Sequence, residues 1–223
     1  MAQIIVFDLN GTLLDLAALD PHFARAFGSP QARREWFDLV VQAVLLSVLH
    51  DDYQDFSKLA QASLRMLADR SGIVLDPSDR KAILDGLKRL PPFADVVEGL
   101  GQLKSAGYRL AVLTNSSRQS AVQLLRRHQL AGFFDAVFSV DEVRRMKPAR
   151  EPYLFAARRL RVRPSGMRLV AAHAWDIAGA AQAGCATALL ARPGQALNPL
   201  WPKPGLQAAD LIELARKLRR FEK

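Results

Sequence analysis

Short apolar runs that end in polar residues recur along the chain, and no other feature restricts its fold as strongly. Ile4 to Phe7 ends at Asp8, and Arg109 to Leu113 ends at Thr114 and Asn115. Continuous apolar runs of this length are typical of strands that are buried on both faces of a parallel sheet. Three further runs of this kind are Ala136 to Ser139, Met167 to Ala172 and Thr187 to Ala191.

Helical patterns lie between these runs, so strand and helix alternate. They cover Val96 to Ser105, Arg118 to His128, Pro152 to Leu160 and Ile177 to Ala183. Glycines close two of them, as is common at helix ends. The alternation predicts an α/β fold with a doubly wound parallel sheet, in which ligands bind at the carboxyl ends of the strands.

One stretch interrupts the alternation. Between Leu16 and Leu90 the pattern is helical, with no convincing strand. The expected helices are Pro30 to Leu49, Asp55 to Ser71 and Pro77 to Lys88, the last of which ends before two prolines. We therefore expect an α-helical cap, residues 16–90, inserted into a Rossmann-like core that consists of residues 1–15 and 91–223.

The chain is basic, with a formal charge of +9 from 31 lysines and arginines against 22 acidic residues. This charge favours small anionic substrates or other anionic partners. The basic residues are spread along helical segments such as Arg216 to Arg220, with no interleaved aromatic residues, so we do not expect nucleic-acid binding. Hydrophobic residues make up 50% of the chain, which is enough for a sizeable core.

Neither the opening segment nor the longest apolar run indicates a membrane or secreted protein. The opening MAQIIVFD lacks the basic region of a signal peptide and soon reaches Asp8. The longest apolar run, Leu39 to Leu49, is broken by Gln42 and Ser47 and is too short to span a bilayer. Cys185 is the only cysteine, so no internal disulfide is possible. We expect a cytoplasmic protein without a membrane partner.

Asp8 is the first candidate for chemistry. It follows the first strand, and Gly11 and Thr12 come next in a tight loop whose backbone N–H groups can face an anion. A carboxylate held at this point can act as a nucleophile that forms an ester with its substrate. Taken alone, Asp8 is better explained as a residue that caps a turn.

Three other strand ends supply matching groups. Thr114 and Asn115 follow the second strand, Lys147 follows the third and Asp176 the fourth. Lys147 would neutralise and orient the Asp8 carboxylate, and Asp176 would position Lys147 or a hydrolytic water. Thr114 and Asn115 would hydrogen-bond Asp8 or the substrate. Suitable groups at four strand ends favour catalysis over turn capping.

With these motifs the chain resembles the haloacid dehalogenase superfamily over essentially its whole length. The shared motifs are Asp8-Leu9-Asn10-Gly11-Thr12-Leu13, Leu113-Thr114-Asn115-Ser116, Lys147-Pro148 and Ala174-Trp175-Asp176. Within the superfamily the chain resembles the type II (S)-2-haloacid dehalogenases. The motifs for that resemblance are Ser139 to Arg144, Lys147-Pro148 with Tyr153, Ala174-Trp175-Asp176, and Arg192-Pro193-Gly194 leading to Pro202-Lys203-Pro204.

The resemblance implies a two-step hydrolysis. Asp8 would attack the halogen-bearing carbon, halide would leave, and water would then attack the ester to release a 2-hydroxy acid. It implies no metal and no cofactor. The catalytic residues would be Asp8, Lys147 and Asp176. The residues around the substrate would be Asn10, Thr12, Phe37, Thr114, Asn115, Tyr153 and His173.

Three positions depart from the family pattern. Phe37 stands where the family has an arginine that helps to bind the substrate and the departing halide. Ala171 stands where a serine is usual, and His173 where an asparagine is usual. His173 fits a catalytic base, a ligand, or a polar residue that only lines the pocket. Arg33 and Arg34 precede Phe37 but reach out from a different helical turn, and a solvated position is their simpler interpretation.

Two rival functions stay open. One is a magnesium-dependent phosphatase, which would carry a second aspartate two positions after the nucleophile. This chain has Asn10 there, which cannot protonate a leaving oxygen, and a magnesium ion prefers more carboxylates than Asp8 and Asp176 supply. The other rival is a non-catalytic module that binds a small anion on the same fold.

The expected helix from 30 to 49 carries a wide apolar stripe. Such a stripe is most often core, but it also fits a pocket wall or a subunit interface, so a homodimer through the cap is possible. Its members are Trp36, Phe37, Val40, Val41, Val44, Leu45 and Val48.

Overall fold

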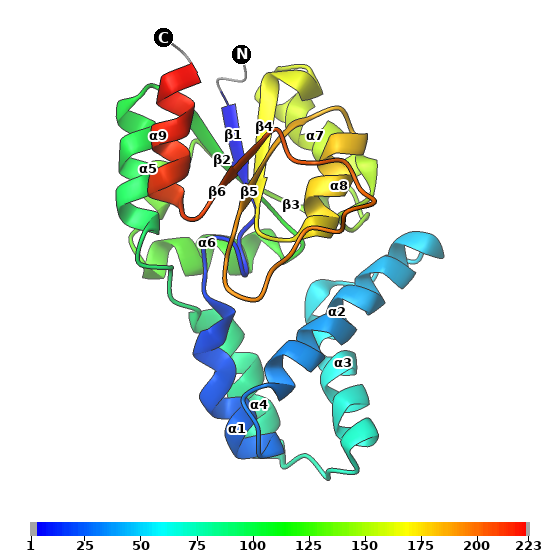
Figure 1. The fold of residues 1–223 in the computed structure, drawn as a ribbon. Helices are drawn as coiled ribbons and strands as arrows, with labels where there is room; N and C mark the ends of the chain where they lie inside the picture. Colours follow the sequence, from blue (N-terminus) through cyan, green and yellow to red (C-terminus); the bar gives the residue numbers. More distant parts are fainter. Residues whose placement is uncertain (1–3, 222–223) are drawn as a thin grey trace.

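The computed structural model describes residues 4–221. Its strands form one parallel sheet in the spatial order β3-β2-β1-β4-β5-β6, with β1 at the point where the order reverses (Figure 1). This confirms the predicted doubly wound α/β fold. The strands are β1 (Ile4–Phe7), β2 (Arg109–Thr114), β3 (Ala136–Ser139), β4 (Met167–Ala171), β5 (Ala186–Leu190) and β6 (Leu206–Ala208).

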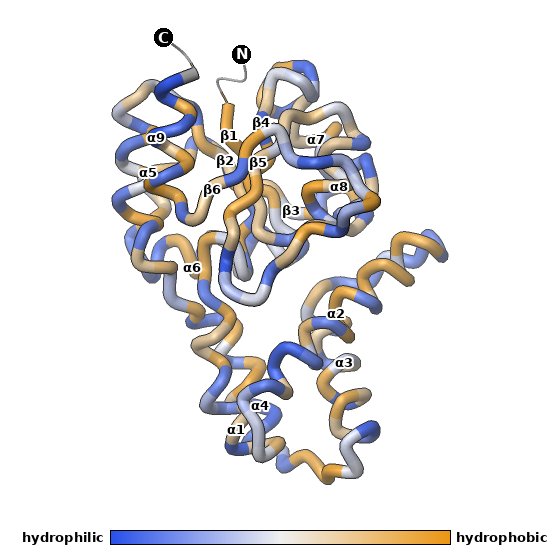
Figure 2. The backbone as a smooth tube through the Cα atoms, viewed as in Figure 1, coloured by the Kyte–Doolittle hydropathy of each residue, from blue (hydrophilic) through white to orange (hydrophobic). Residues whose placement is uncertain are grey.

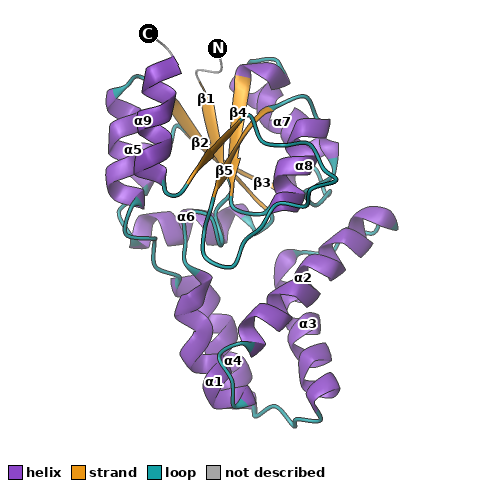
Figure 3. Ribbon diagram, viewed as in Figure 1, coloured by secondary structure: helices purple, strands orange, loops and turns teal. Residues whose placement is uncertain are grey.

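Helices cover both faces of the sheet (Figure 3). The pair α5 (Val96–Ser105) and α9 (Leu211–Phe221) lies on one face, and α7 (Arg150–Leu160) and α8 (Ala174–Gln182) lie on the other. Successive residues of β1 point to opposite faces, so Ile5 and Phe7 belong to one buried cluster and Ile4 and Val6 to the second. β1 is therefore hydrophobic along its length, as Figure 2 shows.

The segment between β1 and α5 is helical and lies beyond the carboxyl ends of the strands (Figure 1). Helices α2 and α3 pack side by side, and the indole of Trp36 donates a 3.0 Å hydrogen bond to the Ala60 carbonyl across that contact. This segment faces the sheet edge where ligands bind in doubly wound folds. Its helices are α1 (Asp20–Phe27), α2 (Ala32–Leu49), α3 (Phe56–Ser71) and α4 (Pro77–Gly86).

The two connections between the helical segment and the sheet lie side by side. The amide of Asp15 donates to the Pro91 carbonyl at 2.8 Å, and the amide of Phe93 donates to the Leu13 carbonyl at 3.0 Å. The chain thus leaves and re-enters the sheet region through one paired crossing. The division into a core of residues 1–15 and 91–223 and a cap of residues 16–90 stays a prediction.

Several element bounds differ from those expected. Helix α2 begins at Ala32 rather than Pro30, and α4 ends at Gly86 before a short turn of 3-10 helix. Within the described residues, none of the helices combines the length and the apolar character that a bilayer-spanning helix needs. The remaining elements are α6 (Arg118–Arg127) and the 3-10 turns Leu16–Leu19, Leu87–Arg89, Ala131–Phe133, Val140–Glu142 and Pro164–Gly166.

Candidate active site

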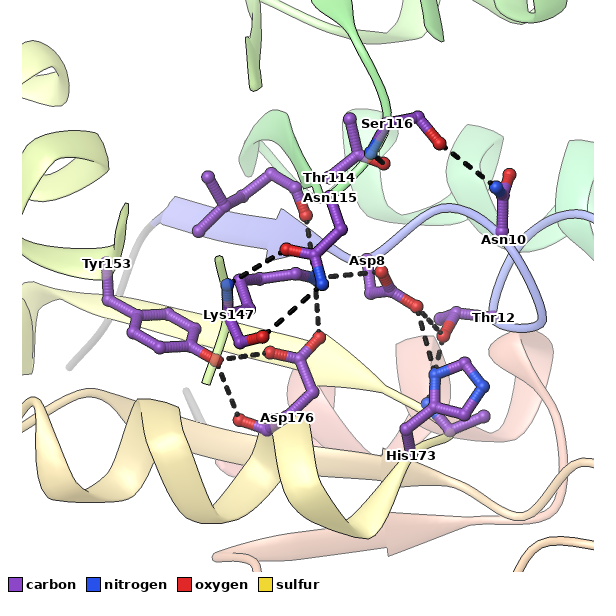
Figure 4. Close-up of polar contacts among 12 residues, drawn as sticks. Asp8, Asn10, Thr12, Thr114, Asn115, Ser116, Lys147, Tyr153, His173 and Asp176 are labelled. Carbon is purple, nitrogen blue, oxygen red and sulfur yellow. Dashed lines mark hydrogen bonds and ion pairs between the residues drawn. The ribbon is translucent and has the colours of Figure 1, made fainter. Parts of the chain in front are cut away.

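Asp8 lies directly after β1, at the centre of the carboxyl edge of the sheet, with 5% of its surface exposed. Its amide donates to the Val170 carbonyl at 3.0 Å, which ties the residue to β4. One carboxylate oxygen, Oδ1, accepts a 2.8 Å hydrogen bond from Lys147, and the other, Oδ2, accepts a 2.6 Å hydrogen bond from Thr12 (Figure 4). The carboxylate is therefore fixed from two sides.

The loop after Asp8 is shaped by Gly11 and Thr12. Gly11 has φ of +78°, a left-handed conformation that residues with a side chain rarely adopt. The hydroxyl of Thr12 donates to Asp8 and accepts a 3.0 Å hydrogen bond from the Ala172 amide, so it has a partner on each side. Thr12 is wholly buried, and its observed contact is with the carboxylate itself.

Lys147 is fully buried, and its ammonium group has three acceptors. It donates to Asp8 Oδ1 at 2.8 Å, to Asp176 Oδ2 at 2.6 Å and to the Leu113 carbonyl at 3.0 Å. An ammonium has three N–H donors, so all of them are used. The buried positive charge stands between two buried carboxylates, as the strand-end pattern predicted.

Asp176, in the first turn of α8, is also fully buried, and both of its oxygens have partners. Oδ2 accepts from Lys147, and Oδ1 accepts a 2.6 Å hydrogen bond from the hydroxyl of Tyr153. Tyr153 was expected around the substrate. The structure places its buried ring behind Asp176, on the side away from Asp8 (Figure 4), so its contact is with the carboxylate that holds Lys147.

This arrangement pushes the pKa values of the two carboxyls apart. Burial alone would raise the pKa of Asp8, but Lys147 and the nearby His173 outweigh it and hold that pKa well below its ordinary value. Burial raises the pKa of Asp176, an effect that Lys147 only partly offsets and the Asp8 charge reinforces. Burial lowers the pKa of Lys147, but Asp176 and Asp8 outweigh it, and the net shift is upward. Asp8 is thus kept ionised beside a charged ammonium.

Thr114 at the end of β2 and Asn115 after it form hydrogen bonds with backbone groups around the site. The side chain of Asn115 accepts a 2.9 Å hydrogen bond from the Lys147 amide and donates to the Lys147 carbonyl at 3.3 Å. The hydroxyl of Thr114 accepts from the Ser116 amide at 3.1 Å. Asn10 donates to the Ser116 hydroxyl at 3.2 Å. Asn115 therefore positions the backbone that carries Lys147, a contact that the sequence did not indicate.

A small cavity of about 30 Å³ adjoins Asp8. Its walls are mostly apolar and come from both parts of the chain. Among its lining residues only Asp8 and His173 carry titratable side chains. The lining residues are Asp8, Asn10, Phe37, Val40, Val41, Val44, Phe56, Thr114, Asn115, Ser116, His173 and Trp175. The apolar stripe on α2 thus supplies part of the pocket wall. Phe56 of α3 also lines the pocket, and the sequence pattern did not indicate this residue.

Two larger cavities flank this one. A cavity of about 450 Å³ between α3, α4 and α6 shares Asn10, Phe56 and Ser116 with it. A separate cavity of about 240 Å³ contains Arg33 and Arg34, and Phe37 lines both this cavity and the one at Asp8. The two arginines therefore lie on the far side of Phe37 from the Asp8 cavity. Arg33 is paired there with Asp20.

In the part of the chain that the structure describes, no three or more histidine, cysteine, aspartate or glutamate side chains are grouped closely enough to hold a metal ion. Asp8 and Asp176 are joined through the ammonium of Lys147.

Comparison with known families identifies the chain. The family model described as "haloacid dehalogenase-like hydrolase" matches residues 2–184. The chain belongs to the haloacid dehalogenase-like hydrolases. The match includes β1 to β4 and the helical segment, and hence Asp8, Lys147 and Asp176.

Individual haloacid dehalogenase-like proteins resemble the chain over nearly all of its length. An (S)-2-haloacid dehalogenase of Pseudomonas sp. (strain YL) is 31% identical over 211 residues, which covers 93% of this chain and 90% of that protein. (S)-2-haloacid dehalogenase 1 of Pseudomonas sp. (strain CBS-3) is 31% identical over 218 residues, covering 97% and 96%. The solved L-2-haloacid dehalogenase of Xanthobacter autotrophicus superposes with a TM-score of 0.88 at 26% identity, covering 98% of this chain and 99% of that one.

Proposed function

We propose that this chain hydrolyses the carbon–halogen bond of a small 2-haloacid through an ester formed on Asp8. The observation that carries the proposal is the Asp8 carboxylate, held by Lys147 and Thr12, at the wall of a largely apolar cavity. The relatives named (S)-2-haloacid dehalogenase support the substrate class.

In the first step Asp8 Oδ2 attacks the carbon that bears the halogen, and the halide leaves with the bonding electron pair. A carboxyl group displaces a halide at carbon as its anion, and the Lys147 ammonium keeps Asp8 anionic despite its burial. Thr12 donates to Oδ2 and orients that oxygen. Val40, Val44 and Phe56 form an apolar wall beside the attacking carboxylate.

In the second step water attacks the carboxyl carbon of the ester on Asp8. Negative charge then develops on Oδ1, which lies 2.8 Å from the Lys147 ammonium, so Lys147 stabilises the tetrahedral intermediate. Asp176, itself held by Tyr153, fixes the ammonium in this position. Lys147 and Asp176 thus act in both steps, first on the nucleophile and then on the ester.

Phe37 bears on the choice of haloacid. It lines the Asp8 cavity at the position where the family pattern has an arginine, and no arginine of the described chain is among the lining residues of that cavity. A guanidinium that binds a carboxylate contributes about 1.5 to 3 kcal/mol per hydrogen bond. We therefore expect weak binding of short haloacids and better binding of those whose apolar part fits Phe37 and the valines of α2.

Halide release from (S)-2-chloropropionate in metal-free buffer tests the proposal, with Asp8→Asn as the matched variant. Release by the native protein and none by folded Asp8→Asn is the expected result. If neither protein releases halide from this substrate or from larger and fluorinated haloacids, the proposal is wrong. Magnesium-dependent hydrolysis of a phosphate ester would then indicate a phosphatase, and ligand binding without turnover would indicate a binding module.

We also propose a homodimer through the helical segment. The support is a set of large apolar side chains that stay exposed on α2 and α3: Leu45, Leu46, Leu49 and Met66. Light scattering tests the dimer: we expect the native protein to be a dimer and Leu46→Lys to be a monomer.

We further propose a cytoplasmic location and no nucleic-acid partner. The buried, unpaired Cys185 supports the location, and the spread of the basic residues along the chain supports the lack of a nucleic-acid partner.

A further inference from the structure

His173 is a titratable residue of the cavity to which the two-step scheme assigns no task. It lies between β4 and α8 with 3% of its surface exposed. Its Nδ1 lies 3.4 Å from Asp8 Oδ2, whereas Lys147 binds Oδ1. The two side chains therefore approach the carboxylate from different sides, as Figure 4 shows.

Neither ring nitrogen of His173 completes a hydrogen bond with a protein group in the described part of the chain. Buried polar atoms usually have a partner. Within the described residues Nε2 has no hydrogen bond and Nδ1 has the 3.4 Å contact with Asp8 in place of one, which indicates a water molecule or a ligand at the ring. The cavity that His173 lines, at about 30 Å³, is large enough for one water molecule. A water bound to Nδ1 would stand next to the carboxyl carbon of Asp8.

Two aromatic rings contact the imidazole. It stacks on Trp175 with the ring centroids 5.3 Å apart and an interplanar angle of 15°. Phe37 packs on it with a centroid distance of 5.3 Å and an angle of 35°. Gly11 allows the close approach of the ring, because a Cβ at that position would lie 2.9 Å from Cε1 and Nε2.

The other polar groups near Asp8 are already engaged. Asp176 is fully buried, does not line the cavity, and has Lys147 on one oxygen and Tyr153 on the other. The ammonium of Lys147 has used its three donors. The Thr12 hydroxyl donates its proton to Asp8. Among the described lining residues, His173 is therefore the side chain whose ring nitrogen can accept a proton from a water in the cavity.

We propose that His173 is the general base that activates water for hydrolysis of the ester on Asp8, an inference that rests on the proposed function. The water oxygen bonds to the Asp8 carboxyl carbon as a ring nitrogen of His173 takes one of its protons. The bond between that carbon and the ester oxygen then breaks, and the ester oxygen leaves as the product hydroxyl with the proton from His173. The regenerated acid of Asp8 loses the second water proton to solvent.

Asp8 and Lys147 carry the charges nearest to the ring. Asp8 faces the ring from the end of β1, and Lys147 lies beyond Asp8 and 5.8 Å from the centre of the Trp175 ring. Phe37 from α2 and Thr12 from the loop carry no charge. Formation of the ester removes the negative charge of Asp8.

The test is rapid-quench halide release together with intact-protein mass measurement, on (S)-2-chloropropionate or the haloacid that the native protein turns over best. The variants are His173→Gln, and His173→Phe, which keeps the aromatic stack but removes both nitrogens. His50→Asn, an exposed histidine after α2, is the matched control. Both His173 variants should release one equivalent of halide per protein at close to the native rate, lose steady-state turnover by about 100-fold or more, and accumulate the ester on Asp8.

The other outcomes separate this inference from the proposed function. If the native protein turns over and the His173 variants turn over equally well, the role of His173 is wrong and the proposed function stands. If folded His173 variants release no halide even in the first turnover, His173 acts in the first step and the inference is also wrong. If the native protein releases no halide from any haloacid, the proposed function fails and the inference fails with it.

Discussion

The ring of Phe37 packs against the ring of His173, with 5.3 Å between the centroids. Phe37 belongs to α2 of the helical segment and His173 follows β4 of the sheet, so the contact joins the two parts of the chain beside Asp8. These are also two of the positions at which the chain departs from the family pattern. The side chains at these two positions are therefore in contact, so a substitution at one affects the environment of the other.

Replacing Phe37 with arginine tests how the cavity treats a carboxylate substrate. Phe37→Arg places a guanidinium in the wall of the Asp8 cavity and is expected to lower KM for a short haloacid by about tenfold, the effect of one charged hydrogen bond. Steady-state kinetics of Phe37→Arg and of the apolar control Phe37→Leu measure this. An unchanged KM for Phe37→Arg would show that the substrate carboxylate binds elsewhere.

Lys147→Met tests the buried charge arrangement. The change leaves Asp8 and Asp176 buried without their shared cation, which is expected to lower the free energy of unfolding by about 3 to 5 kcal/mol. Lys81→Met is the control, because Lys81 pairs with Asp85 on the surface, where solvent screening leaves such pairs little effect on stability. Urea denaturation of both variants measures the difference. Equal losses would contradict a structural role for the Lys147 charge.

The Lys147 variant also has a predicted pH dependence. The pKa of Asp8 is held low by Lys147, so the native nucleophile stays ionised as the pH falls from 8 to 5. Without the ammonium, burial raises the pKa of Asp8, and any remaining first-turnover halide release is expected to decline as the pH falls through that range. Halide release from stoichiometric protein at several pH values measures this. A residual rate that rises with acid would contradict it.

Gly11→Ala tests the fit between the loop and His173. Gly11 and Gly28 have similar dihedral angles, φ of +78° and +74°, so an alanine brings similar backbone strain at each. A Cβ at Gly11 meets the His173 ring at 2.9 Å, whereas a Cβ at Gly28 meets nothing within 4 Å. Gly11→Ala is therefore expected to lose turnover and Gly28→Ala to keep it, at comparable losses of about 1 kcal/mol in stability. Equal activities would show that the ring position is not critical.

Cys185 should be unreactive in the folded protein. Burial, with a further contribution from Asp176, raises the pKa of its thiol to about 12, so almost no thiolate forms at pH 8. A chromogenic thiol reagent is expected to label the protein in urea and not in buffer at that pH. Rapid labelling of the native protein would show that the region around β5 opens readily.

The sheet and the meeting of Asp8, Lys147 and Asp176 were predictable because of a simple geometric property. Parallel strands bring their carboxyl ends to one edge, so residues that follow different strands converge even when they lie 139 positions apart, as Asp8 and Lys147 do. The apolar runs mark the strands, and the polar residues after them mark the edge. Their catalytic roles stay predictions.

The contacts of single side chains were not predictable in the same way. The sequence does not tell that Asn115 binds the backbone of Lys147, or that Tyr153 lies behind Asp176, because both depend on side-chain direction. Helix α1 and strand β6 were also missed. Both are short: the helix has eight residues, of which Phe23 is buried, and the strand has three residues at the sheet edge.

The central claim, that Asp8 forms a covalent ester, is tested most directly by oxygen labelling in H₂¹⁸O with protein in excess over haloacid. Because water attacks the carboxyl carbon, the product hydroxyl is expected to carry the unlabelled oxygen of Asp8, and the peptide that contains Asp8 is expected to gain ¹⁸O. Mass spectrometry of the product and of a protease digest measures both. A product that carries ¹⁸O, with no label in the Asp8 peptide, would show direct attack by water and would contradict the account.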